Sequence, residues 1–354
     1  MKIVTIVGAR PQFIKAALVS RELRKTHTEI LVHTGQHYDQ DMSDIFFNQL
    51  AISDPEYNLG IGSASHGKQT GEMLAAVEKV LLDENPDWVV VYGDTNSTLA
   101  GALAASKLHI KVAHVEAGLR SLNRAMPEEI NRVLTDHISD LLLCPSQVAV
   151  DNLVREGITK GVQIVGDVMH DALLWSLANI PHNPEELLVS YQLHKRDYLL
   201  LTIHRAENTD DPQRLASILD ALNTVDEKIL WPIHPRTRKK LSEYRLPIPE
   251  NITIIDPLGY FDMLLLMKNA RKILTDSGGM QKEAYWLQVP CITLRDETEW
   301  VETIQVGWNI LAGASPEKII DDVKNWQPPT DHPTIYGDGT TAQKIITLLS
   351  EFDK

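Results

Sequence analysis

The chain has 354 residues, of which 43% are hydrophobic and 23% charged, and its formal net charge is −14. A chain of this length exceeds one ordinary core, so two domains of about 150–180 residues are expected. The negative charge excludes a general nucleic-acid-binding surface, and any anionic ligand must be held by a local cluster of positive groups.

The N-terminal stretch MKIVTIVGARPQF has too short an apolar run for a secretory signal, and no run approaches the length of a membrane span. We therefore expect a cytoplasmic protein without membrane association. Cys144 and Cys291 lie in apolar, strand-like segments with no second thiol nearby in the sequence. Buried, reduced thiols are the expected state of both.

Short branched-apolar runs alternate with amphipathic stretches along the whole chain. The predicted strands are KIVTIVG, EILVHTG, DWVVVYG, KVAHVEAG, DLLLCPS and VQIVGD, followed by YLLLTIH, KILWPIHP, NITIID, KILTDSG, PCITLRD and NILAG. Nearly all are apolar on both faces, which is typical of central parallel strands covered by helices. Segments such as STLAGALAASKL and EEINRVLTDHIS are typical of those helices. This alternation predicts an α/β fold with open, doubly wound sheets.

A domain junction is expected between Gly166 and Tyr198, where the polar, proline-bearing PHNPEELLVSYQLHKRD follows a helical segment. We expect one Rossmann-like domain over residues 1–168 and a second over residues 169–339, each with ligands beyond the carboxyl ends of its strands. The tail TAQKIITLLSEFDK predicts a helix over about residues 340–354, which we expect to return to the first domain.

The segment ILTDSGGMQKEA passes from a predicted strand through Ser277, Gly278 and Gly279 into a predicted helix. Unpaired backbone N–H groups at a helix start favour an anion, and glycines let a phosphate approach closely. Glu283 lies one turn further on, where its carboxylate can accept hydrogen bonds from sugar hydroxyls. A capped helix whose glycines serve only the turn is the competing interpretation.

The first predicted strand ends in GARPQFIKAA, which lacks the G-x-G-x-x-G of dinucleotide-binding folds and the G-x-x-x-x-G-K-[ST] of P-loops. Dehydrogenase and NTPase functions are therefore disfavoured. Arg10 and Lys15 follow this turn, so two cations lie near a second helix start. A surface arginine and a lysine that extends its ammonium to solvent are the alternative.

Three carboxylates follow strands or turns of the first predicted domain. Asp94 follows VVVYG, Glu116 follows KVAHV, and Glu128 lies in MPEEI. Each has a structural alternative: a helix N-cap, an ion pair with Arg120 and a favourable contact with a helix dipole, respectively. If the three converge on one cleft, they raise one another's pKa toward the range useful for proton transfer.

In the second predicted domain, LTIHRAEN and WPIHPRTRKK each place a histidine after a strand. These are His204 and His234, with Arg205 and Arg236 beside them. Metal binding is disfavoured, because the sequence has no H-E-x-x-H and no paired cysteines. A lone histidine at a strand end is commonly structural, whereas a histidine with an arginine at a cleft suits a pyrophosphate or a leaving-group charge.

Together these segments resemble the non-hydrolysing UDP-N-acetylglucosamine 2-epimerases. The matching stretches, in the family's order, are GARPQFIK, TGQHYDQDM, VYGDTNSTLA, HVEAGLRS, MPEEINRVLTD, VGDVMHDAL, HRAEN, HPRT and LTDSGGMQKEA. The resemblance implies a GT-B-like pair of Rossmann-type domains with the active site in the cleft between them. GT-B glycosyltransferases have a similar fold, whereas the G-D-T, H-V-E-A-G-L-R and P-E-E-x-N-R signatures favour the epimerase.

The resemblance also implies roles for individual residues. The catalytic positions match Asp94, Glu116, Glu128 and His204. The substrate-binding positions are Arg10, Lys15, His234, Arg236, Tyr260, Ser277, Gly278, Gly279 and Glu283. A UDP-sugar and UDP are the implied ligands, no metal or cofactor is implied, and the family resemblance suggests a homodimer that serves cell-surface polysaccharide biosynthesis.

The implied reaction inverts C2 of UDP-N-acetylglucosamine by elimination of UDP to a 2-acetamidoglycal, followed by re-addition. The C2 proton is not acidified by an adjacent carbonyl, so its removal must be coupled to departure of UDP. Which carboxylate is acid and which is base stays open. The alternatives are a GT-B glycosyltransferase that uses a UDP-sugar, a hydrolysing epimerase and a non-catalytic nucleotide-sugar sensor.

Further stretches bear on substrate and regulation. HRAENTDD, SGGMQKEA and RDETEWVE look particularly like the branch that acts on UDP-2,3-diacetamido-2,3-dideoxy-glucuronate, so this sugar is a second candidate substrate. Family members activated by a second UDP-N-acetylglucosamine share a glutamine-histidine element, which matches Gln36 and His37. The arginine expected further on is absent from SASHGKQTGEML, so we do not expect activation of this type.

Overall fold

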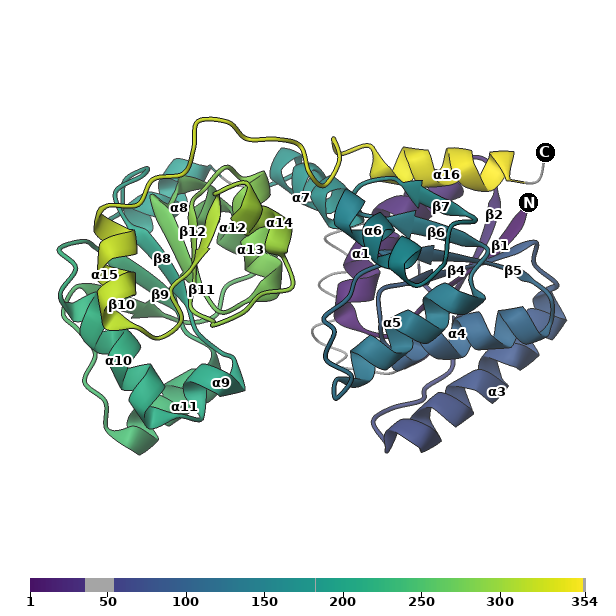
Figure 1. The fold of residues 1–354 in the computed structure, drawn as a ribbon, viewed down its shortest axis with the longest axis horizontal. Coiled ribbons are helices and arrows are strands. Elements are labelled where there is room, and N and C mark those ends of the chain that lie inside the picture. The colour runs from purple at the N-terminus through teal and green to yellow at the C-terminus, as the bar shows by residue number, and fades with distance from the viewer. Residues whose placement is uncertain (36–53, 182, 353–354) are drawn as a thin grey trace. The chain divides into compact units, whose positions relative to one another are not determined.

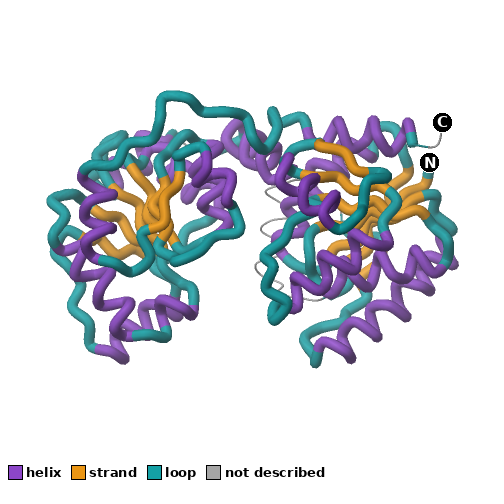
Figure 2. The backbone as a smooth tube through the Cα atoms, in the orientation of Figure 1, coloured by secondary structure: helices purple, strands orange, loops and turns teal. Residues whose placement is uncertain are grey.

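The computed structural model describes residues 1–35, 54–181 and 183–352, so Gln36 and His37 lie outside the described residues. The chain divides into two compact units, which we call unit 1 (Met1–Trp175 with Thr334–Lys354) and unit 2 (Ser176–Pro333). Each unit contains one parallel β-sheet (Figure 1). Helices flank the strands of both sheets, as Figure 2 shows, so the predicted α/β class and doubly wound sheets are confirmed.

The sheet of unit 1 has the strand order β3-β2-β1-β4-β5-β6-β7, and every neighbouring pair is parallel. Its strands are β1 (Lys2–Val7), β2 (Thr28–His33), β3 (Tyr57–Asn58), β4 (Trp88–Tyr92), β5 (Lys111–Val115), β6 (Leu141–Cys144) and β7 (Val162–Ile164). All residues of the central strand β4 are buried, because helices cover both of its faces. The sequence did not predict β3, which at two residues is too short for a hydrophobic pattern.

The described helices of unit 1 are α1 (Arg10–Leu23), α3 (His66–Glu84), α4 (Asn96–Lys107), α5 (Pro127–Ile138), α6 (Gln147–Arg155) and α16 (Thr341–Glu351). Helix α7 (Val168–Ala178) passes from unit 1 into unit 2. The C-terminal helix α16 packs against α1 and buries Ile345 and Leu349 completely. Phe352 extends this contact, with its ring edge-on to that of Trp88.

The sheet of unit 2 has the order β10-β9-β8-β11-β12-β13, and its neighbouring strands are again parallel. Its strands are β8 (Leu199–Thr202), β9 (Ile229–Pro232), β10 (Ile252–Ile255), β11 (Lys272–Thr275), β12 (Cys291–Thr293) and β13 (Asn309–Leu311). Its helices are α8 (Pro184–Ser190), α9 (Ala206–Thr209), α10 (Pro212–Asn223), α11 (Pro235–Tyr244), α12 (Tyr260–Asn269), α13 (Gly278–Trp286), α14 (Val301–Gln305) and α15 (Pro316–Lys324).

The strand order of each sheet identifies where a ligand site belongs. In unit 1 the chain proceeds from β1 to β2 in one direction and continues on the other side with β4. In unit 2 the same reversal separates β8 from β11. Ligands of open α/β sheets bind outside the carboxyl ends of the strands at such a switch point. We therefore expect ligand-binding and catalytic residues in the segments that follow β1, β4, β8 and β11.

Candidate active site

Glu116 follows β5 directly and has a φ of +73°, which is uncommon for a residue with a side chain. Its N–H donates to the carbonyl of Leu143 at 3.1 Å, so pairing with β6 continues through this residue. Its carboxylate forms an ion pair with the ammonium of Lys15, and the two side chains are only 10% and 13% exposed. Such a backbone conformation costs on the order of 1–3 kcal/mol and is typical of functional sites.

Lys15 lies on α1 and directs its ammonium toward carboxylates rather than toward solvent. Burial alone lowers the pKa of Lys15, but Glu116, Asp94 and Asp167 more than offset burial and raise that pKa. The ammonium therefore remains charged. The alternative pairing of Glu116 with Arg120 is wrong, since Arg120 pairs with Asp136 and Glu156 instead.

Asp94 lies just beyond β4, and its side chain is 32% exposed. It does not cap α4, because the N-cap is Thr95, whose hydroxyl accepts from the N–H of Thr98. Its Oδ2 instead accepts from Nε and Nη2 of Arg132 at 2.9 and 2.7 Å. The N-cap alternative is therefore wrong, and Asp94 forms a charge-assisted pair with Arg132 instead.

Gly93 brings the residues around Asp94 and Glu116 together. It has a φ of +62°, and its N–H donates to the carbonyl of Val115 at 3.0 Å. A Cβ atom at Gly93 would lie 3.3 Å from both Oε2 of Glu116 and Nζ of Lys15. The ion pair therefore lies directly against the turn that carries Asp94.

Glu128 lies in the first turn of α5, is exposed, and makes no hydrogen bond or ion pair with any residue that the structure describes. Its neighbour Glu129 is buried and accepts hydrogen bonds from Ser121 and from the N–H of Leu122, so it holds the preceding loop. The structure thus leaves Glu128 beside a helix start. Arg10 is the first residue of α1.

In unit 2, the fully buried Asp276 follows β11 and organises the segment after β8. Its carboxylate accepts hydrogen bonds from the N–H groups of His204 (3.0 Å) and Arg205 (2.9 Å), and from the side-chain amide of Asn208 (3.1 Å). Its Oδ1 also lies 3.2 Å from Nδ1 of His204. The sequence pattern did not predict a role for Asp276, although its position between a strand and the SGG turn was the available signal.

The carboxylate of Asp276 also sets the state of the His204 ring. Because a carboxylate oxygen lies 3.2 Å from Nδ1 of His204, it favours the proton on that nitrogen. Burial lowers the pKa of His204, with Arg205 and His234 adding to the effect and Asp276 opposing it. The ring is therefore neutral at neutral pH, and 40% of the side chain is exposed for contact with a ligand.

Replacing Asp276 with asparagine is expected to destabilise the protein by about 1–3 kcal/mol, because an amide N–H₂ would face buried donors. It should also lower kcat, because the His204 tautomer is no longer fixed. Thermal unfolding and steady-state kinetics measure the two effects. The matched control is Asp296→Asn, since Asp296 is 64% exposed and pairs with Arg214 at the surface. Equal effects of the two variants would contradict the assigned role.

The helix start of α13 is open. Ser277 is its N-cap and accepts from the N–H of Met280, and neither Gly278 nor Gly279 has a positive φ. A Cβ at Gly278 would lie 2.4 Å from Oε1 of Glu299, so a side chain there would displace the Glu299 carboxylate. A Cβ at Gly279 would meet no atom of the described residues closer than Oγ of Ser277 at 4.0 Å. The capped helix of the competing interpretation is present, but neither glycine is required by a positive φ, and Gly279 leaves the start of α13 without a side chain.

Glu283 lies further along α13 and is partly buried. Tyr260, the first residue of α12, donates its hydroxyl to Oε1 of Glu283 at 3.2 Å. Burial raises the pKa of Glu283 to about 7, and burial together with Glu283 raises the pKa of Tyr260 well above its usual range. The carboxyl group can therefore gain or lose its proton near neutral pH.

His234 and Arg236 lie at the start of α11, and both are exposed. Nδ1 of His234 accepts from the N–H of Arg236 at 3.2 Å, so this ring caps the helix. The guanidinium of Arg236 pairs with Asp210. The rings of His204 and His234 lie 6.2 Å apart, so the structure brings both histidines to the same edge of the sheet.

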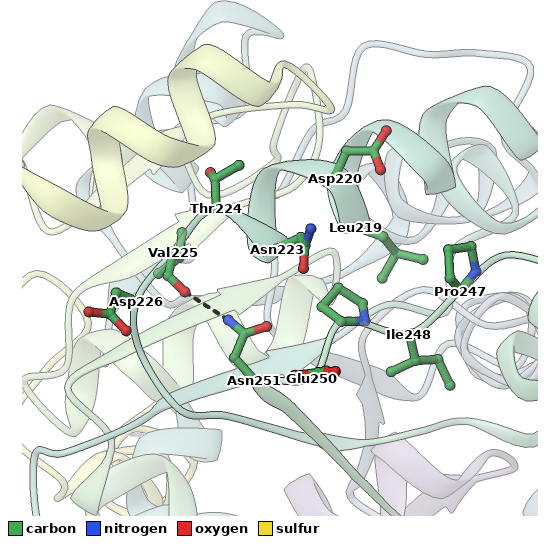
Figure 3. A pocket seen from close by; sticks show the side chains of 11 residues that line it. Leu219, Asp220, Asn223, Thr224, Val225, Asp226, Pro247, Ile248, Glu250 and Asn251 are labelled. Carbon is green, nitrogen blue, oxygen red and sulfur yellow. Dashed lines mark hydrogen bonds between the residues drawn. The ribbon is translucent and has the colours of Figure 1, made fainter.

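A pocket of about 510 Å³ lies elsewhere in unit 2 (Figure 3). Its lining comes from the end of α10 and from the loops that enter β9 and β10, including Asp226, Glu250 and Asn251. The side chain of Asn251 ties these loops together by donating to the carbonyls of Leu222 and Val225. The pocket therefore lies at the amino ends of these strands, whereas the candidate site residues follow carboxyl ends.

Other expectations concern metals, membranes and thiols. Within the described ranges, no group of three His, Cys, Asp or Glu side chains is arranged to hold a metal ion. None of the described helices is both long and apolar enough to cross a membrane. Cys144 and Cys291 are unpaired, buried thiols, and burial raises the pKa of each to about 12, as expected for unreactive core residues.

Comparison with known proteins identifies the family. The family model described as UDP-N-acetylglucosamine 2-epimerase matches residues 21–350. A Methanococcus maripaludis UDP-N-acetylglucosamine 2-epimerase homolog is 56% identical, with 99% of each chain covered. The Pseudomonas aeruginosa UDP-2,3-diacetamido-2,3-dideoxy-D-glucuronate 2-epimerase is 49% identical over 99% of this chain and 100% of its own. The crystal structure of Methanocaldococcus jannaschii UDP-GlcNAc 2-epimerase in complex with UDP-GlcNAc and UDP has a TM-score of 0.85 at 48% identity, covering 99% of each chain. This chain therefore belongs to the UDP-N-acetylglucosamine 2-epimerase family.

Proposed function

We propose that the protein is a non-hydrolysing UDP-N-acetylglucosamine 2-epimerase that interconverts UDP-N-acetylglucosamine and UDP-N-acetylmannosamine. The observation that carries the proposal is the Glu116 carboxylate, held in a strained conformation at the end of β5 and paired with Lys15 beside the Asp94 turn. A protein that only binds a nucleotide sugar has no need of such carboxylates. The related structure that contains UDP-GlcNAc and UDP supports the choice of substrate.

The reaction is an elimination followed by an addition. A carboxylate removes the C2 proton, the electrons of that C–H bond form the C1–C2 double bond, and the C1–O bond breaks to release UDP. The product of this half is a 2-acetamidoglycal. Return of UDP to C1, with delivery of a proton to the opposite face of C2, gives the epimer. No electrons are gained or lost overall.

We assign the proton exchange at C2 to Asp94, Glu116 and Glu128. Lys15 pairs with Glu116 and Arg132 pairs with Asp94, whereas Glu128 is exposed in the described structure. Glu116 thus has a buried cation beside it, which fixes the position of its carboxylate.

We assign the nucleotide to unit 2. The bare start of α13, with Ser277, Gly278 and Gly279, holds the diphosphate, and His204 stabilises charge on the leaving UDP. Glu283 and Tyr260 bind the ribose. Further substrate-binding positions, carried over from the family, are Arg10, Lys15, His234 and Arg236. The observed Lys15–Glu116 pair adds a link from this set to the proton-exchanging residues.

Glu283 predicts a pH dependence. Because the pKa of Glu283 is raised from 4.5 to about 7, its neutral carboxyl stabilises the fold fully below pH 4.5. This stabilisation is lost as the pH rises through about 7. The ionised carboxylate is the better acceptor of hydrogen bonds from ribose hydroxyls. Binding of UDP-N-acetylglucosamine at pH 6.5 should therefore release a proton from Glu283. Calorimetry in buffers of different ionisation enthalpy measures this release. Glu283→Gln should abolish it, and proton uptake by the unsubstituted protein would contradict the assignment.

Turnover in D₂O tests the proposed function. Deuterium should enter C2 of recovered UDP-N-acetylglucosamine, together with appearance of the manno epimer by NMR. Epimer formation without deuterium at C2 would refute the elimination, and free sugar would indicate a hydrolysing enzyme. The 49% identity to the Pseudomonas aeruginosa enzyme favours one second substrate, UDP-2,3-diacetamido-2,3-dideoxy-glucuronate, which the same assay compares directly.

Three finer expectations complete the proposal: action in the cytoplasm, assembly as a homodimer and supply of a sugar nucleotide for cell-surface polysaccharide. Their support is the family resemblance alone. Sedimentation of the purified protein checks the second of them.

A further inference from the structure

His114 occupies an unusual place in β5, two residues before Glu116. Its side chain is fully buried. Nδ1 lies 2.7 Å from Oδ1 of Asp136, and Nε2 lies 2.7 Å from the carbonyl oxygen of Gly93. The ring therefore joins α5 to the turn that carries Asp94.

The two partners of the ring determine its protonation. A carbonyl oxygen and a carboxylate oxygen are both acceptors, so each needs an N–H from the ring. A neutral imidazole has one N–H and would place a lone pair against an oxygen at 2.7 Å on its other side. With Asp136 as a carboxylate, the imidazolium, with both ring nitrogens protonated, donates to Asp136 and to Gly93 at once.

The surroundings of the ring can hold such a charge. Asp136 also accepts from the N–H of Gly118 (3.1 Å) and from Arg120 (2.7 Å), which in turn pairs with Glu156. Burial raises the pKa of Asp136, but His114 and Arg120 more than offset it, so the pKa is lowered and the group is a carboxylate. The positive charges of His114 and Arg120 then balance the negative charges of Asp136 and Glu156, and this pairing offsets the cost of burying them.

Other titratable groups near the ring do not upset this balance. The Cys144 thiol on β6 stays neutral, because burial raises its pKa to about 12. Lys15 and Glu116 form their own pair against Gly93. Asp94 has Arg132 as its partner.

His114 and its partner Asp136 each hydrogen-bond to one of the two turns that carry the candidate carboxylates. Gly93 is held twice by β5, through its N–H to Val115 and through its carbonyl to His114. Gly118, two residues after Glu116, is held by Asp136. Displacement of the ring would therefore move the Asp94 turn relative to Glu116.

We infer that His114 is a buried imidazolium, paired with Asp136, that positions the carboxylates of Asp94 and Glu116 relative to each other for proton exchange at C2. His114 is a positioning residue and does not itself touch the substrate. Its charge is inferred from the two acceptor oxygens that face the ring, whereas its catalytic consequence rests on the proposed function.

NMR of the ¹⁵N-histidine-labelled protein tests the protonation state without substrate. His114 should show two protonated ring nitrogens, with slowly exchanging protons, at pH 7. His33 is the internal contrast, because burial lowers its pKa to about 4 and its ring is neutral at this pH. An unprotonated nitrogen on His114 at pH 7 would overturn the inference.

Two variants test the positioning. His114→Asn keeps a donor to Asp136 but leaves the Gly93 carbonyl unpaired, whereas His114→Gln can still reach that carbonyl with its amide N–H₂. We expect kcat to fall on the order of 10²-fold in H114N, with the KM and the UDP affinity within about threefold of the unsubstituted protein. H114Q should retain at least about ten times the kcat of H114N.

His109→Asn is the matched control, since His109 is exposed and has a φ of +58° that asparagine accepts readily. It should keep full activity. Equal activity in H114N and the unsubstituted protein, or a parallel loss of UDP affinity and kcat, would overturn the positioning role. Absence of turnover in the unsubstituted protein would instead count against the proposed function, and the NMR result would still decide the charge on His114.

Discussion

Replacing Glu116 with glutamine is expected to lower kcat for epimerisation by about 10³–10⁴-fold, because the amide cannot accept the C2 proton. UDP affinity should stay within about twofold, since we assign the nucleotide to unit 2. The exchange of deuterium into C2 should fall by the same factor as kcat. Rapid-quench kinetics and calorimetric titration with UDP measure the two quantities separately.

The same substitution has a structural cost that must be measured alongside. Glu116 is the partner of the buried Lys15 ammonium, and an unpaired buried charge destabilises a protein by about 3–5 kcal/mol. The double variant Lys15→Met with Glu116→Gln removes both charges and should recover part of that stability without recovering activity. Recovery of activity together with stability would show that Glu116 is only half of a structural ion pair.

A carboxylate at the open helix start should abolish nucleotide binding. Gly279→Asp is expected to weaken UDP affinity by at least about 10²-fold, because juxtaposing like charges costs several kcal/mol. The fold should remain intact, since a side chain at Gly279 meets no described atom within contact distance and an acidic residue favours a helix start by about 0.3–1 kcal/mol. Calorimetry with UDP and thermal unfolding measure the two effects.

Gly279→Ala is the matched control for this variant. It adds the Cβ atom without the charge, so its effect isolates how closely the phosphate approaches the backbone. We expect a smaller loss of affinity than in Gly279→Asp. Unchanged UDP binding by Gly279→Asp would place the diphosphate away from α13 and would contradict the proposed assignment.

Hydrophobic patterns predicted the fold well. Runs that are apolar on both faces, such as the WVVVY of β4, form fully buried central strands. The spacing of Ile345 and Leu349 predicted the buried face of α16. The two-residue strand β3 was missed, because a segment that short has no periodicity. Strand order was likewise beyond the sequence, although it determines which strand ends lie at the switch points.

Single residues were harder to interpret than elements, because their partners come from distant parts of the chain. Lys15 and Glu116 are 101 residues apart, and no local pattern shows that they pair. For Asp94 and Glu116 the structure excludes the alternatives left open by the sequence, whereas Glu128 still lies at a helix start with no described partner. Asp276 and the His114–Asp136 pair were missed, since their roles depend on burial and on counting donors against acceptors.

In the proposed reaction, the bond between C1 and the diphosphate breaks and re-forms while the acids of unit 1 exchange the proton at C2. Positional isotope exchange measures this bond directly. UDP-N-acetylglucosamine with ¹⁸O in the bridge between C1 and the β-phosphorus should, during turnover, move that label into the non-bridging β-phosphate oxygens, as seen by ³¹P NMR. Epimer that accumulates while the label stays in the bridge would contradict the account.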